Sequence, residues 1–112
     1  MSPTGRKQAI KDFKALKPYR GIYLVRCLTT GNLWTGASRD LRAAQNGLWF
    51  GLNHGSCLDR ALQSEWDAEG EAAFEYSVLE ALDEDVHELA VKDLLREKHL
   101  EWSARLGSRK LL

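Results

Sequence analysis

The residues best suited to chemistry lie in two short triplets, Gly21-Ile22-Tyr23 and Trp34-Thr35-Gly36, on either side of a turn. A tyrosine hydroxyl donates and accepts hydrogen bonds, whereas an indole offers one N–H donor and cannot act as a base. Zinc chemistry is not indicated, because the two cysteines cannot form a four-ligand site and the three histidines are not spaced as a zinc set. The distribution of charged residues along the chain is instead compatible with a site that contacts phosphate groups.

The charged residues are segregated along the chain, although 16 Lys and Arg balance 16 Asp and Glu. The first twenty residues carry six basic side chains against Asp12 alone, and no basic residue occurs from Glu65 to Glu88. The chain becomes basic again from Lys92 onward. This asymmetry permits a basic patch that meets phosphate, and solvated helix faces explain it equally well.

Length and composition limit the architecture to one domain with a modest core. The chain has 112 residues, of which 44% are hydrophobic and 29% charged, as in ordinary globular proteins. No stretch approaches the length of a membrane-spanning helix, and no apolar run follows the first positive charges as in a secretory signal. We therefore expect a cytoplasmic protein that has no contact with membranes.

The hydrophobic pattern predicts an α/β domain with a small three-stranded sheet flanked by helices. Residues 29–32 supply a turn between two β-rich runs, which predicts a hairpin. The predicted helices cover residues 6–16, 39–53, 58–70 and 85–106, and the predicted strands cover residues 21–27, 33–37 and 73–79. A single domain would then span residues 1–112, with a basic N-terminal helix within residues 1–20 and a core over residues 21–106.

The two triplets resemble the signature of the GIY-YIG nuclease family, with Trp34 in place of the second tyrosine. The likeness runs from about Gly21 onward and includes later stretches in the family's order: Leu62-Gln63-x-x-Trp66, Gly70-Glu71, Phe74-Glu75-x-x-Val78-Leu79-Glu80 and Leu94-Leu95-Arg96-Glu97. The resemblance implies the family's fold and metal-assisted cleavage of nucleic-acid phosphodiesters. It also implies Mg²⁺ or Mn²⁺ as the cofactor.

The resemblance assigns roles to individual residues. Tyr23 matches the first family tyrosine, which helps to activate or position the attacking water. Trp34 occupies the second catalytic position, where we expect it to pack. Glu97 matches the glutamate that holds the metal, and Glu101, one helical turn later, is the alternative. We expect Tyr23 and Glu97 to face one concave surface.

The arginine that binds the scissile phosphate in the family is missing here. Its two expected positions are Ala44 and Gly47, which share one flank of the predicted helix. The active site is therefore degenerate. Other residues remain as candidates, with Arg42 and Arg60 as catalytic substitutes and Arg39, Arg42, Arg60 and His54 as nucleic-acid contacts.

Two functions follow from this pattern. One is a metal-dependent endonuclease that hydrolyses DNA phosphodiester bonds, with weak activity because the arginine is missing. The alternative is a catalytically inactive family member that binds nucleic acid or a protein partner. A basic side chain in the cleft beside Tyr23 would favour the first, because the transferring phosphoryl group needs cationic stabilisation.

Overall fold

The computed structural model describes residues 19–111, so the predicted helix over residues 6–16 lies outside the described part. Its elements are β1 (Gly21–Cys27), β2 (Leu33–Ser38), α2 (Leu41–Asn53), α3 (Arg60–Glu69), the short 3₁₀ turn η1 (Glu71–Ala73), β3 (Phe74–Ala81), α4 (Glu88–Leu106) and β4 (Arg109–Lys110). No helix within this range is long and apolar enough to cross a bilayer.

The four strands form one mixed sheet in the order β3-β1-β2-β4. β1 pairs antiparallel with both β2 and β3, which confirms the predicted hairpin and the predicted third strand. The predicted α/β class is also confirmed. β4 was not predicted, and it adds a fourth strand through parallel pairing with β2, where Trp34 lies beside Arg109 and Thr35 beside Lys110.

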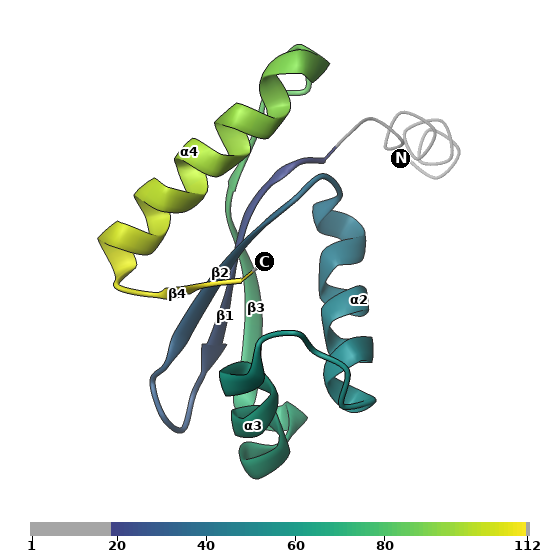
Figure 1. Cartoon of the computed structure of the whole chain (residues 1–112), viewed down its shortest axis with the longest axis vertical. Coiled ribbons are helices and arrows are strands. Elements are labelled where there is room, and N and C mark those ends of the chain that lie inside the picture. Colours follow the sequence, from purple (N-terminus) through teal and green to yellow (C-terminus); the bar gives the residue numbers. More distant parts are fainter. Residues whose placement is uncertain (1–18, 112) are drawn as a thin grey trace, which may run out of the picture.

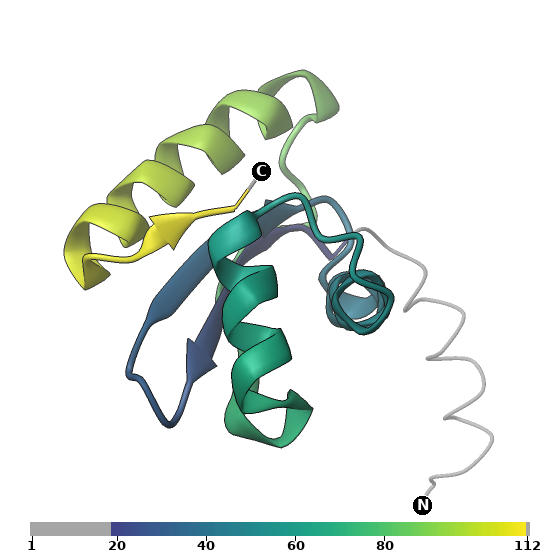
Figure 2. The ribbon, with the colours of Figure 1, turned by 60° about the horizontal axis from the view of Figure 1, so that its bottom comes forward.

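The helices cover both faces of the sheet, with α4 on one face and α2 and α3 on the other (Figures 1 and 2). Successive side chains of a strand point to opposite faces. Tyr23 and Val25 therefore join the core under α2 and α3, whereas Ile22 joins Val91 and Leu95 under α4. The predicted site residue Tyr23 thus lies on the sheet face opposite α4.

Polar caps fix where the helices begin. Asp40 accepts a hydrogen bond from the Arg42 N–H, so α2 begins at Leu41 and not at residue 39. The predicted last helix also begins later than expected, at Glu88 and not at residue 85. Its preceding residues form a turn in which the Val86 N–H donates to the Asp83 carbonyl, and His87 then caps the helix.

Two carboxylates of α3 bind the turn between β1 and β2, and one of them, Glu69, accepts a hydrogen bond from the Thr29 hydroxyl at 2.9 Å. Glu65 accepts hydrogen bonds from the Thr30 hydroxyl and from the Asn32 amide, the latter at 2.8 Å. Desolvation opposes ionisation of Glu65, but the hydrogen bonds from Thr30 and Asn32 outweigh it and hold the pKa of Glu65 below its ordinary value. The ionised carboxylate therefore stabilises the contact between the hairpin and α3.

Glu65→Gln is expected to lower the urea midpoint of unfolding at neutral pH, because an amide is a weaker acceptor than a carboxylate. This contribution is present above the ordinary glutamate pKa of 4.5 and is lost as the pH falls through the lower pKa of the folded state. The midpoints of wild type and variant should therefore converge below about pH 4.5. Glu71→Gln, at an exposed glutamate of η1, is the control. A constant difference at all pH values would contradict the role of Glu65.

Candidate functional site

The two triplets meet through a close contact between Tyr23 and Gly36, which are paired across the hairpin. A Cβ atom at Gly36 would overlap the end of the Tyr23 ring and lie 2.8 Å from its Cε2 atom. The ring of Tyr76 stacks on Tyr23 with 5.2 Å between the ring centroids. The second glycine of the pattern is therefore required because the phenol of the first triplet lies against it.

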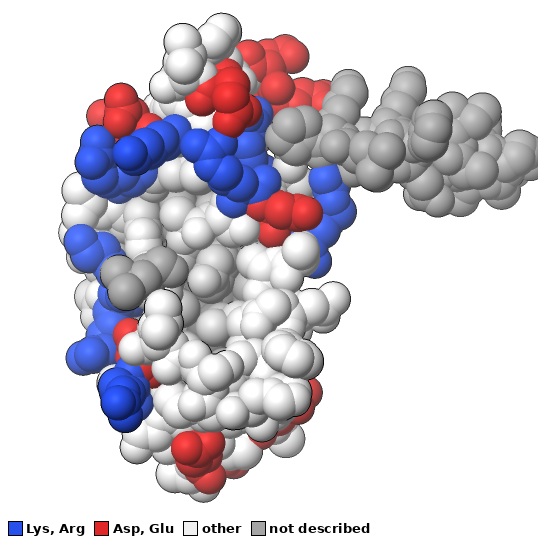
Figure 3. Space-filling view, turned by 45° about the vertical axis from the view of Figure 1, so that its right-hand side comes forward, with Lys and Arg blue, Asp and Glu red and all other residues white. Residues whose placement is uncertain are grey.

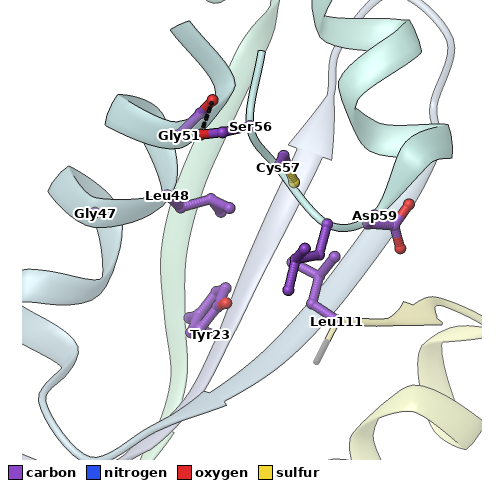
Figure 4. Close-up of a pocket in the computed structure, with 9 residues that line it drawn as sticks. Tyr23, Gly47, Leu48, Gly51, Ser56, Cys57, Asp59 and Leu111 are labelled. Atoms are coloured by element: carbon purple, nitrogen blue, oxygen red, sulfur yellow. Dashed lines mark hydrogen bonds between the residues drawn. The ribbon is translucent and has the colours of Figure 1, made fainter. Parts of the chain in front are cut away.

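A pocket of about 200 Å³ opens beside Tyr23. Figure 4 shows the Tyr23 hydroxyl turned towards it, with Gly47 and Leu48 of α2 across from Asp59 and Leu111. Nine residues line it, from β1, α2, the α2–α3 connection and the segment after β4: Tyr23, Gly47, Leu48, Gly51, Ser56, Cys57, Leu58, Asp59 and Leu111. None of the nine carries a positive charge.

The polar groups of the pocket are poorly suited to act as bases. Burial, with a smaller contribution from Cys57, raises the pKa of the Tyr23 phenol above 10. Burial likewise raises the pKa of the Cys57 thiol. The Asp59 carboxylate caps α3 by accepting from the Leu62 N–H at 3.0 Å, and it points away from Tyr23 in Figure 4. At neutral pH the phenol and the thiol both stay protonated.

Of the predicted arginines, Arg39 and Arg42 lie near the start of α2 and do not line the pocket. Arg39 forms an ion pair with Glu88 at the beginning of α4. The guanidinium of Arg42 lies over the ring of Tyr19, 5.2 Å from its centroid, and 3.9 Å from Asp40. Both side chains are about half exposed.

Arg60 comes nearest to the pocket. It lines a neighbouring depression whose wall of Ser56, Cys57 and Leu58 is shared with the pocket beside Tyr23. Within residues 19–111 its guanidinium forms no ion pair or hydrogen bond. His54 lies outside both depressions, since its ring packs on Phe50 and its Nδ1 atom lies 2.8 Å from the Phe50 carbonyl oxygen.

Trp34 lies in the core and not in the pocket. It is 1% exposed and packs near Phe74, as expected for a packing role at the second catalytic position. Its Nε1 atom has no hydrogen-bond partner within the described residues. An indole buried in this way cannot reach a substrate, so the structure does not bring the two signature aromatics together at one pocket.

Glu97 is also separate from Tyr23, contrary to the expectation of a shared surface. It lies beside Lys98, Leu100 and Glu101 on an exposed part of α4, across the sheet from the pocket. Leu95 faces the core. Glu97 comes two residues later and is rotated about 200° around the helix axis, so it faces the solvent. Glu101, the alternative, lies in the same exposed groove.

The part of the chain that the structure describes gathers few metal ligands near Tyr23. Among residues 19–111, no group of three His, Cys, Asp or Glu side chains is placed to hold a metal ion. Asp59 supplies the one carboxylate of the pocket, and its Oδ1 atom is occupied as a helix cap. Sequence reasoning missed Leu111 as a pocket residue, and the only available signal was its apolar type shortly after Gly107.

Comparison with solved structures relates this arrangement to a nuclease fold. The catalytic domain of the homing endonuclease I-TevI, a GIY-YIG enzyme, superposes with a TM-score of 0.69 at 22% identity, covering 83% of this chain and 98% of that domain. Its E75A mutant, described as an intron endonuclease, gives the same TM-score at 24% identity, covering 80% and 84%. No protein-family model and no curated protein sequence matches the chain. The chain therefore has a GIY-YIG-like fold, which confirms the resemblance at the level of the fold.

Proposed function

We propose that this chain is a nuclease-type domain that binds nucleic acid beside Tyr23 and does not hydrolyse it at an enzymatic rate. The observation that carries the proposal is the lining of the pocket, which contains no Lys, Arg or His and whose one ionisable carboxylate is that of Asp59. Phosphoryl transfer develops negative charge that a cation or guanidinium must offset, and losing such stabilisation typically lowers the rate by about 10²–10³-fold. The fold is then retained as a binding scaffold.

Unpaired cations near the pocket support nucleic acid as the ligand. Most basic side chains within residues 19–111 have an acidic or aromatic partner, but Arg60, Lys92, Arg109 and Lys110 have none. Arg60 adjoins the pocket, and Arg109 lies on the same side of β4 as the lining residue Leu111, because alternate residues of a strand share a face. Figure 3 shows Lys and Arg at the margins of a largely uncharged face. Exposed cations of this kind bind phosphate by releasing counterions.

Metal-dependent hydrolysis of DNA is the second candidate, and the position of the Tyr23 hydroxyl favours it. In this case Tyr23 would orient water, Glu97 would hold Mg²⁺ or Mn²⁺, and Arg60 or Arg42 would bind the scissile phosphate. Arg60 is the better placed of the two, because its depression shares a wall with the pocket. The separation of Glu97 from Tyr23 weighs against this candidate.

The purified protein is expected to retain DNA in a salt-sensitive manner and to leave supercoiled plasmid intact in the presence of Mn²⁺. Arg60→Ala should weaken binding and reduce the dependence of log K on log salt by about one unit, because one phosphate contact is lost. Arg96→Ala is the matched control, since Arg96 is paired with Asp93 on the exposed side of α4. Nicking that disappears in Tyr23→Phe would overturn the binding proposal in favour of hydrolysis.

Introducing an arginine at a position where the family arginine is missing also distinguishes nucleic-acid binding from hydrolysis. A Cβ atom at Gly47 would meet no atom within 4 Å outside its own stretch of helix, so the position has room for Gly47→Arg, which gains about 1 kcal/mol of helix propensity. Ala44→Arg, on the same flank, is its companion, although Ala44 is partly buried against the core. We expect both to tighten DNA binding without plasmid nicking, because Glu97, the expected metal ligand, lies across the sheet from the pocket. Nicking by either variant would mean that the missing arginine alone limits catalysis.

A further inference from the structure

We propose that the pocket beside Tyr23 receives one unpaired base of a single-stranded nucleic acid, an inference that rests on the proposed nucleic-acid binding. The walls are mostly apolar, because Leu48, Leu58 and Leu111 line the space and the aromatic Tyr23 borders it. Such walls suit the faces of a planar base and offer nothing to a phosphate. A base inside a duplex cannot enter a side pocket unless it leaves the stack, so an unpaired base is the preferred occupant.

Leu58 marks the mouth of this pocket. It is 81% exposed and belongs both to the pocket and to the depression that contains Arg60. A leucine this exposed gains little from folding, but it would bury apolar surface against a base that enters beside it. The Tyr23 hydroxyl and the Cys57 thiol supply the polar atoms within reach of the base edge.

The two unpaired guanidiniums give the strand a path past the pocket. Arg60 directly follows Asp59, and Arg109 lies two residues before Leu111. Figure 4 places Asp59 and Leu111 on the same side of the pocket, across from Gly47 and Leu48 of α2. A backbone along this side can place phosphates near both arginines while one base points towards α2. The walls are mostly apolar, and a hydroxyl and a thiol can each donate or accept a hydrogen bond, so the site should tolerate any of the bases.

The test compares oligonucleotides of one length by fluorescence anisotropy: a single strand, its duplex, and a single strand whose bases are replaced by abasic sugar. The single strand should bind on the order of tenfold more tightly than the abasic strand, since a stacked base contributes about 1–3 kcal/mol. It should also bind more tightly than the duplex. Equal affinity for all three strands would overturn the base pocket and leave the proposed nucleic-acid binding intact.

Matched variants assign the effect to the pocket. Leu58→Ala should remove most of the advantage of the single strand over the abasic strand and leave abasic binding unchanged. Leu89→Ala is the control, because Leu89 is an equally exposed leucine, at 85%, on α4. Arg60→Ala should weaken all three ligands alike. A Leu58→Ala variant that still distinguishes the strands would contradict the assignment, and absence of binding to any strand at low salt would overturn both proposals.

Discussion

Gly36→Ala is expected to destabilise the domain by about 2–3 kcal/mol, the upper part of the range of about 1–3 kcal/mol that is typical of overpacked cores. The added methyl group would overlap the end of the Tyr23 ring, which cannot move aside because it is 93% buried and stacked on Tyr76. In a domain of this size the loss corresponds to a decrease in Tm of roughly 10 °C or more. Urea and thermal unfolding would measure it.

Gly47→Ala is the matched control. It should raise stability, because the position is open and alanine has a higher helix propensity than glycine within α2. A double-mutant cycle with Tyr23→Ala tests the cause. If the added methyl group clashes with the ring, the effects of the two substitutions will not add, because removing the ring also removes the clash. Additive effects would place the strain elsewhere in the hairpin.

Trp34→Ala is expected to be the most destabilising substitution in the described sheet, at about 3–5 kcal/mol. The indole is 1% exposed and fills the core between β1, β4 and Phe74, so its removal leaves a large cavity. Denaturant unfolding, monitored by far-ultraviolet circular dichroism, would report the change. Phe50→Ala, at a ring that is 64% exposed, should alter stability much less.

Trp34→Phe distinguishes packing from hydrogen bonding. The smaller ring loses contacts, but it also removes the buried Nε1 donor, which has no partner in the described part of the chain. An unsatisfied buried donor typically costs about 1–3 kcal/mol, so the two effects should partly cancel. A loss as large as that of Trp34→Ala would imply that the indole N–H has a partner, such as an ordered water.

The hairpin and its position in the sheet could be predicted because local chemistry determines them. Turn residues join two β-rich runs, and alternation then assigns Tyr23 to one face of the sheet. β4 could not be predicted in the same way. It is a two-residue strand, held through contacts such as the Leu111 N–H donating to the Thr35 carbonyl oxygen at 2.7 Å, and two residues show no periodicity.

The candidate site was only partly predictable, because motif spacing does not determine which way a helix faces. Glu97 was chosen from the order of residues along a helix, but the direction of Leu95 towards the core turns Glu97 to the solvent. Ala44 and Gly47 were correctly singled out as positions without charge, and the pocket at Gly47 has no cation in its lining. Arg60 was among the candidates named from the sequence, but its place beside the pocket required the tertiary structure, since the shared wall comes from the connection between two helices.

The open flank at Gly47 also offers a place to attach a chemical probe. A Cβ atom built there has no atom within 4 Å outside its own stretch of helix, and the residue borders the pocket. A cysteine at this position, in a background where the partly exposed Cys57 is replaced by serine, could carry a spin label or fluorophore, while the buried Cys27 stays protected from the reagent. The label would then report directly, by its mobility or emission, whether a ligand occupies the space beside Tyr23.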